Sequence, residues 1–217
     1  SIWLMGISWI LSGVIGFVLG IISGVKEGKL IDKIIRGYCY ILMSTPTFWL
    51  GILFIMVFSV SLGWFPVALS VPIGVVSSQV SLVERIQHII LPALTLSVIS
   101  ISSMCMYTRE KVLEIMKSDY ILFAKARGEK TSKIVLNHVL KNVSLPAITL
   151  QFLSFSELFG GTIFVEQVFS YPGLGQATVS AGLKGDLPLL MGIAIISLVF
   201  VYSGNIIADL LYRVVDP

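Results

Sequence analysis

Long apolar runs separated by short polar segments dominate the pattern of this chain. Five runs are long enough for a helix to cross a bilayer, which takes about 20 apolar residues. They are apolar on every face, whereas the strands of a membrane barrel alternate apolar and polar residues. The pattern therefore predicts an all-α polytopic transmembrane helix bundle, a single domain over residues 1–217. The predicted spans are about 2–23, 38–62, 87–108, 145–165 and 187–209.

The remaining polar residues gather between these runs. Residues 109–144 form the only sizeable polar region, and Gly63, Pro66 and Pro72 predict an exposed loop after the second run. Hydrophobic residues make up 56% of the chain and charged residues only 12%. Because a soluble domain carries about 25% charged residues, this composition argues against a soluble protein and excludes a disordered one.

The two cysteines, Cys39 and Cys105, both lie in apolar surroundings. Their spacing matches neither a metal site nor a disulfide framework. We therefore expect two small buried apolar residues, and no metal site.

The lysines and arginines are distributed very unevenly. Four lie at 26–36, eight at 109–144 and one at Arg213, whereas the segments on the other side hold only Arg85 and Lys184. Because basic loops stay in the cytoplasm, the C-terminus is predicted inside and the N-terminus outside. The first apolar run lacks the features of a signal peptide. We therefore expect the chain to belong to a longer protein with six spans.

The loop 109–144 carries the signals of a helical hairpin. Residues 120–127 suit a helix, and Gly128 is predicted to end it as a left-handed C-cap. Thr131 or Ser132 is predicted to cap a second helix, and Pro146 to lie in the first turn of the next span.

Two interpretations of this loop stay open. It is either a solvated basic linker attracted to anionic lipid or a docking element. Ala124 and Gly128 are four residues apart, so they share a helical face with almost no side chain, which permits close approach by another protein.

Four strings in matching order carry a resemblance that covers nearly the whole chain. They are STPTFWLG at 44–51, DYILFAKARG at 119–128 with HVLKN at 138–142 and LP at 145–146, VEQVFSYPGLG at 165–175, and ADLLY at 208–212 with DP at the end. Together they resemble the permease subunits of binding-protein-dependent ABC importers, in the dipeptide, oligopeptide and nickel subfamily. The FWLG string is similar to the first-permease type. Phe123 stands where this subfamily usually has threonine.

The resemblance implies a multi-pass protein of a bacterial or archaeal plasma (inner) membrane. The implied partners are a homologous second permease subunit, two ATP-binding cassette subunits, an extracytoplasmic substrate-binding protein and the lipid bilayer, but no nucleic acid. Loop 109–144 becomes the cytoplasmic coupling loop. Its matching positions, which would contact the ATPase, are Asp119, Tyr120, Ala124, Ala126, Arg127, Gly128, His138, Asn142 and Pro146.

The chain lacks the G-x-x-x-x-G-K-[ST] phosphate loop. We therefore expect a transport subunit that is not an enzyme and binds no cofactor of its own. The resemblance implies that ATP and magnesium belong to a partner chain.

Seven residues are candidates for the translocation path or gate. Glu157 interrupts the fourth apolar run, where an acid faces either a cavity or a packing partner. Residues 171–173 suit a type II turn that forms either an outer lip, pinned by Glu166, or a plain connector. Pro46 starts or kinks its span, as a gating hinge or as a static bend. The full set is Pro46, Trp49, Glu157, Glu166, Tyr171, Pro172 and Gly173.

The favoured function is that of an importer permease that forms the path for peptides, nickel or similar small solutes. It would couple to separate ATPase subunits through the 119–146 segment. The alternative is a self-contained channel or ion-driven secondary transporter, for which inverted repeats are typical and no internal repeat is visible.

Overall fold

The computed structural model describes residues 1–71 and 80–215, and within these it omits the side chains at 211, 212, 214 and 215. Pro72 of the predicted loop and the DP end of the last string lie outside the described residues. The described part contains helices and no strands, which confirms the all-α prediction.

Twelve helical segments follow one another along the described chain. Two of them, η1 and η3, are π-helical and directly continue α3 and α6. In order, the segments are α1 (Ile2–Val25), α2 (Leu30–Met43), α3 (Thr47–Phe54), η1 (Ile55–Ser61), α4 (Leu82–Met116), α5 (Asp119–Ala126), α6 (Thr131–Ile134), η3 (Val135–Val139), α7 (Leu140–Leu153), α8 (Phe155–Val168), α9 (Leu174–Lys184) and α10 (Leu187–Val215).

Three described helices are long and apolar enough to cross a membrane by themselves. They are α1, α4 and the Leu187–Leu210 part of α10. Two further candidates are interrupted helices, α2 followed by α3 and η1, and the helix over 131–153 followed by α8. Counting each interrupted pair as one span gives five candidate spans within the described residues.

Pro46 explains the first interruption. It takes an extended backbone conformation and forms the N-cap of α3, so that the apolar stretch restarts as a new helix there. Proline has no backbone N–H. At the start of a helix this costs no hydrogen bond, because an N–H there would have no acceptor within the helix. The sequence predicts that Pro46 starts or kinks its span, and it starts a helix.

The chain divides into two compact units. Unit 1 comprises Ser1–Ile10, Thr45–Val98 and Phe155–Ser203, and unit 2 comprises Leu11–Ser44, Ile99–Ser154 and Gly204–Pro217. The helices α1, α4 and α10 each contribute residues to both units. The chain also passes from one unit to the other after Ser44 and after Ser154, and both places coincide with the interruptions in the helices.

A glycine stripe on α1 holds it against α4 in unit 2. Gly16, Gly20 and Gly24 recur every four residues on one face of the helix, and a Cβ added to any of them would lie 2.5–2.7 Å from an α4 side chain. Only glycine permits this approach, as in the small-residue interfaces of membrane helices. The α4 side chains that face these three glycines are Met104, Thr108 and Val112.

In unit 1, α8 packs beside α3 and leads into α9. Gly51 of α3 allows close packing, since a Cβ there would lie 3.2–3.3 Å from side chains that include those of Val168 and Phe169. The backbone N–H of Leu69 donates to the Phe169 carbonyl at 2.9 Å. These contacts fix the end of α8, where the predicted turn begins.

Candidate functional site

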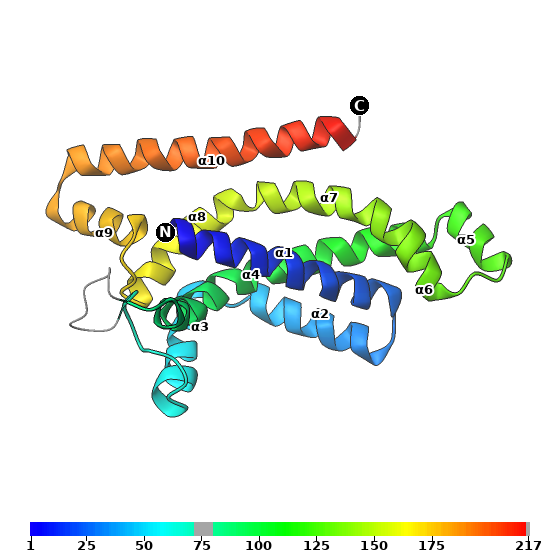
Figure 1. The fold of residues 1–217 in the computed structure, drawn as a ribbon, viewed down its shortest axis with the longest axis horizontal. Helices are drawn as coiled ribbons and strands as arrows, with labels where there is room; N and C mark the ends of the chain where they lie inside the picture. The colour runs from blue at the N-terminus through cyan, green and yellow to red at the C-terminus, as the bar shows by residue number, and fades with distance from the viewer. Residues whose placement is uncertain (72–79, 216–217) are drawn as a thin grey trace. The chain divides into compact units, whose positions relative to one another are not determined.

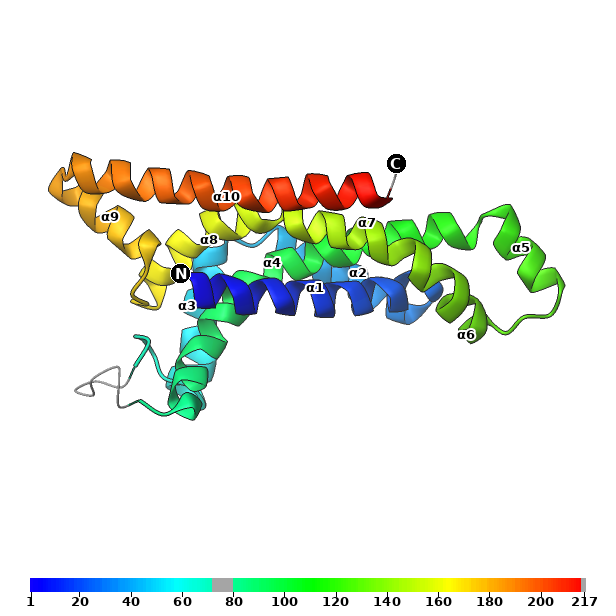
Figure 2. The same cartoon turned by 45° about the horizontal axis from the view of Figure 1, so that its top comes forward.

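The hairpin formed by α5 and α6 stands beyond the end of α4 and joins it to α7 (Figure 1, Figure 2). Gly128 has a φ of +81°, in the left-handed region that favours glycine. Its N–H donates to the Lys125 carbonyl at 2.9 Å, and the Glu129 N–H donates to the Ala124 carbonyl at 3.2 Å. These two bonds form a Schellman motif. The predicted left-handed cap at Gly128 is therefore confirmed.

The predicted caps of the second helix are wrong. Lys130 is the N-cap, because its carbonyl already accepts hydrogen bonds from Lys133 and Ile134, and Thr131 is the first helical residue. Pro146 does not start a helix either, since it lies inside α7. The helix runs from 131 to 153 without a break, and Val143 and Ala147 on either side of Pro146 are buried.

The small docking face predicted from Ala124 and Gly128 does not form. The Ala124 side chain is only 6% exposed and faces the interior of unit 2, whereas Gly128 is exposed. The spacing of the two residues is helical, but Gly128 lies beyond the helix end, where the chain turns away. Ala124 instead belongs to the core beneath the hairpin, which comprises Val112, Ile121, Ala124, Ile134, Val139 and Val143.

Four of the residues that the hairpin exposes are large and apolar. We define the hairpin surface as Tyr120, Leu122, Phe123 and Leu136, which are 48–66% exposed. The Arg127 guanidinium lies 6.0 Å from the centre of the Phe123 ring. Sequence reasoning placed only Tyr120 of these four in the site. The missed signal is that Leu122 and Phe123 lie between Ile121 and Ala124, which share a helical face, so that one pair faces outward when the other is buried.

Glu129 ties the predicted polar residues of the hairpin together. Its Oε1 atom lies 2.9 Å from Arg127 Nη2, and its Oε2 atom lies 3.7 Å from His138 Nε2. Asn142 donates to the Tyr120 hydroxyl at 3.5 Å and to the His138 carbonyl at 2.7 Å. Four predicted residues thus meet across the turn. Sequence reasoning missed Glu129, for which its place between the cap glycine and the next helix is the only local signal.

Asp119 and Ala126 lie at the two ends of α5 and are exposed. The Asp119 carboxylate falls in the first helical turn, where a negative charge is favourable. Neither residue takes part in the contacts of Glu129.

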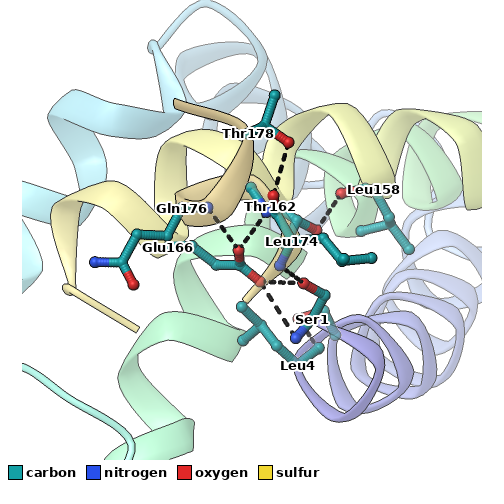
Figure 3. Close-up of polar contacts among 10 residues, drawn as sticks. Ser1, Leu4, Leu158, Thr162, Glu166, Leu174, Gln176 and Thr178 are labelled. Atoms are coloured by element: carbon teal, nitrogen blue, oxygen red, sulfur yellow. Dashed lines mark hydrogen bonds and ion pairs between the residues drawn. The ribbon is translucent and has the colours of Figure 1, made fainter. Parts of the chain in front are cut away.

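The turn between α8 and α9 is organised by a fully buried carboxylate, that of Glu166 (Figure 3). Its Oε2 atom accepts the N–H of Gly175 at 2.8 Å and that of Gln176 at 3.2 Å. The Ser1 hydroxyl donates to Oε1 at 2.6 Å and accepts the Leu174 N–H at 2.7 Å. The carboxylate thus caps the first turn of α9, where helix N–H groups lack partners. Glu166 pins this turn, as the sequence predicts.

The predicted type II turn at 171–173 is wrong. Such a turn needs a positive φ at its third residue, but Gly173 is extended, with a φ of −170°. Ser170 takes the left-handed conformation instead, with a φ of 46°, and the Tyr171 N–H donates to the Glu166 carbonyl at 2.9 Å. Gly173 is required because a Cβ there would overlap the Glu166 carboxylate.

Tyr171 and Pro172 lie beside this cap. Tyr171 lines a pocket of about 360 Å³ in unit 1, together with Trp3, Arg85 and other residues. Burial raises the pKa of the Tyr171 hydroxyl above its ordinary value, and the Glu166 carboxylate adds to that rise. Pro172 is exposed.

The remaining path candidates face away from their own chain. Pro46 is exposed, Trp49 is half exposed, and Glu157 is exposed in the first turn of α8. Glu157 and Glu166 therefore lie on one helix but differ completely in burial. Among the described residues, no group of three or more His, Cys, Asp or Glu side chains is placed to hold a metal ion.

Comparison with known proteins identifies the family. Residues 16–217 match the family described as "Binding-protein-dependent transport system inner membrane component". The oligopeptide transport system permease protein AppB of Bacillus subtilis (strain 168) is 37% identical over 217 residues, which are 100% of this chain and 68% of AppB. The glutathione transport system permease protein GsiC of Escherichia coli (strain K12) is 34% identical over 218 residues, which are 100% of this chain and 67% of GsiC.

Two further comparisons agree. The di/tripeptide transport system permease protein DppB of Pseudomonas aeruginosa (strain UCBPP-PA14) is 30% identical over 95% of this chain and 66% of its own length. A chain of the MetNI methionine ABC transporter, in an inward-facing conformation, matches with a TM-score of 0.76 at 18% identity, over 99% of this chain and 94% of that one. This likeness shows a shared fold. The chain belongs to the family of binding-protein-dependent transport system inner membrane components, the permease subunits of ABC importers.

Proposed function

We propose that this permease moves peptides. The observation that carries the proposal is the match along the whole chain to permeases named for oligopeptide and glutathione transport. The chain spans 66–68% of the length of the three permeases compared above. Family membership decides against the self-contained channel and the ion-driven carrier. Nickel remains a substrate of the wider subfamily, without support among these three permeases.

In this proposal the hairpin surface docks on an ATP-binding cassette subunit. Tyr120, Leu122, Phe123 and Leu136 expose apolar area on an otherwise charged loop, and such a patch marks a site of protein contact. The Gly128 cap and the Glu129 contacts stiffen the loop. A stiff loop with an apolar surface can pass a push from a partner to the spans. ATP and magnesium are bound by that partner, and this chain binds neither.

The basic residues orient the assembly. The hairpin and the C-terminus lie in the cytoplasm, because eight of the fifteen lysines and arginines fall in loop 109–144. A substrate-binding protein delivers peptide on the opposite side, which carries the turn pinned by Glu166. Two ATPase subunits and a homologous second permease complete the importer.

The translocation path runs between this chain and the second permease. Glu157 and Trp49 support this, since both are exposed on helices of otherwise apolar sequence. A carboxylate facing lipid would be costly, so Glu157 faces the path or the partner. There it attracts the ammonium group of a peptide. Pro46, which starts the helix that carries Trp49, belongs to the same path.

The test is peptide uptake by the full importer in proteoliposomes, with a labelled tripeptide and ATP supplied to the ATPase side. We expect uptake that requires ATP, the binding protein and the hairpin surface. Phe123→Asp places a charge in the proposed contact at a side chain that is 66% exposed, so folding stays unchanged while uptake and co-purification of the ATPase subunits are lost.

Leu183→Asp is the matched control, because Leu183 is 85% exposed in α9 and lies far along the chain from the hairpin. It should transport like the wild type. Normal uptake by Phe123→Asp would refute the docking assignment, and uptake without ATP would refute the importer.

A further inference from the structure

A second buried carboxylate, that of Asp32 in the first turn of α2, belongs to none of the predicted sites. Asp32 is fully buried in unit 2. Arg109 of α4 donates to it through Nε at 2.7 Å and through Nη2 at 3.0 Å. The Ser23 hydroxyl donates at 2.7 Å and the Gly28 N–H at 2.9 Å. Both carboxylate oxygens therefore accept two hydrogen bonds each.

A pair of this kind contributes orientation more than net stability. Desolvation of the buried carboxylate and of the mostly buried guanidinium offsets most of their attraction. The bidentate geometry, however, fixes the guanidinium plane against the carboxylate plane and so sets the register of the two helices. Exposed pairs, such as Lys117 with Glu27 at 3.1 Å, impose no such register.

Arg109 connects this pair to the hairpin. It lies three residues before Val112, a member of the core beneath the hairpin, and seven before Met116, where α4 ends. The Met116 carbonyl accepts a hydrogen bond from Lys125 of α5 at 3.3 Å. A displacement of the hairpin therefore reaches α4 directly. It does not reach α2 in the same way, because α2 contributes no residue to that core.

A second contact lies further along the same two helices. Cys39 of α2 and Cys105 of α4 are both fully buried and free, and their thiols are in hydrogen-bond contact. Cys39 follows Asp32 by two helical turns, and Cys105 precedes Arg109 by one. The two contacts define one seam between α2 and α4.

We propose that Asp32 and Arg109 form a latch that makes α2 move with α4 and the hairpin when the ATPase subunits engage. This inference rests on the proposed function. Asp32 and Arg109 are positioning residues, because they act through the helices that they join. The latch carries the motion to the end of α2 at Met43, three residues before Pro46.

The decisive variant removes both charges. Asp32→Asn alone leaves the Arg109 guanidinium without its carboxylate, and Arg109→Gln alone leaves the buried Asp32 carboxylate with only the longer contact of 3.5 Å to Arg36. Each should therefore lower the yield and the melting temperature of the purified permease. The double variant Asp32→Asn/Arg109→Gln removes both of these charges and should regain much of the yield and the melting temperature, because the Arg36 guanidinium, which also lies 3.5 Å from Asp32, belongs to a side chain that is 35% exposed. If the pair served only folding, peptide uptake would return as well. We expect instead that peptide moved per ATP hydrolysed stays at least about fivefold below wild type, the lower end of ordinary coupling factors.

The control is the exposed pair, Lys117→Gln/Glu27→Gln, which should leave uptake per ATP unchanged. All these importers should still co-purify with the ATPase subunits, since the hairpin surface is intact. If the Asp32→Asn/Arg109→Gln importer moved as much peptide per ATP as the wild type, the latch would be refuted and the proposed function would stand. A wild-type importer without ATPase subunits or ATP-dependent uptake would overturn the proposed function, and the latch with it.

The native cysteines supply an independent test. Copper(II)–phenanthroline, added as oxidant, takes two electrons from the Cys39 and Cys105 thiols, which lose two protons and form one disulfide. If α2 and α4 move together, this bond leaves wild-type uptake unchanged and restores uptake per ATP in Asp32→Asn/Arg109→Gln. Cys39→Ser variants should show no response to the oxidant. Loss of wild-type uptake on cross-linking, or failure of the bond to form, would contradict the latch.

Discussion

The hairpin and the turn between α8 and α9 are held in place by different means. Beneath the hairpin lies an apolar core of six buried residues, while its polar contacts, through Glu129, lie nearer the surface. The turn relies on one side chain, since the Glu166 carboxylate accepts the N–H groups at the start of α9. Many residues therefore together fix the position of the hairpin. A substitution on its surface alters contacts with partners and not the position itself. At the turn, one substitution alters the fold.

The largest effect is expected where the turn depends on Glu166. In Glu166→Leu the N–H groups of Gly175 and Gln176 lose their buried acceptor, which should lower the free energy of unfolding by about 3–5 kcal/mol. Thermal unfolding of the purified permease in detergent measures the loss.

Glu157→Leu is the control, because Glu157 lies on the same helix and is exposed. It should leave the melting temperature nearly unchanged. An equal fall in melting temperature in the two variants would mean that the Glu166 cap contributes no more to stability than the exposed Glu157.

The next largest effect is expected at Gly173. It tests whether glycine is required there by the space available or by the backbone conformation. Gly173 has an extended backbone that any residue adopts, but a Cβ there would overlap the Glu166 carboxylate. Gly173→Ala should therefore cost roughly 3 kcal/mol, the upper end of overpacking costs. Gly173→Asn should be worse, since a larger side chain meets the same oxygen atoms. Chemical unfolding of both variants tests this order, and a stable Gly173→Asn would contradict it.

The opposite order is expected at Gly128 in the hairpin. No atom lies within 4 Å of a Cβ added there, but its φ of +81° is unfavourable for other residues. Gly128→Ala should cost about 1–2 kcal/mol. Gly128→Asn should recover part of this, because asparagine tolerates the left-handed region.

Unfolding curves of the two Gly128 variants provide the measurement. Gly128→Trp adds bulk beside the proposed docking surface, so we expect it to insert in the membrane and to lose coupled transport. A less stable Gly128→Asn would mean that space, and not backbone conformation, selects glycine here.

The comparison also shows where sequence reasoning succeeds. The apolar runs predict the helices because lipid requires each span to satisfy its own backbone. The cap at Gly128 is predictable because its cause is local. The type II turn at 171–173 is wrong because its cause is the Glu166 side chain, which lies several residues upstream and is turned inward by the fold.

Contacts between distant residues explain the rest of the difference. Asp32 and Arg109 are 77 positions apart, and nothing in either neighbourhood predicts that they meet. Ala124 shows a related limit. Helical spacing says which residues share a face, but only the packing of α5 on the core decides which face is buried.

The smallest effect is expected at Glu157, and it bears on function instead of stability. Its carboxylate is exposed at the start of α8, in contrast to Glu166 on the same helix. If it receives the ammonium group of a peptide, Glu157→Gln should raise the KM for a tripeptide by about threefold, within the range of an exposed ion pair. The N-acetylated tripeptide, which lacks that charge, should show no change. Glu110→Gln, at another exposed acid, is the control. Uptake kinetics of Glu157→Gln that match wild type for both peptides would remove Glu157 from the path and leave it as a solvated residue that favours the first turn of α8.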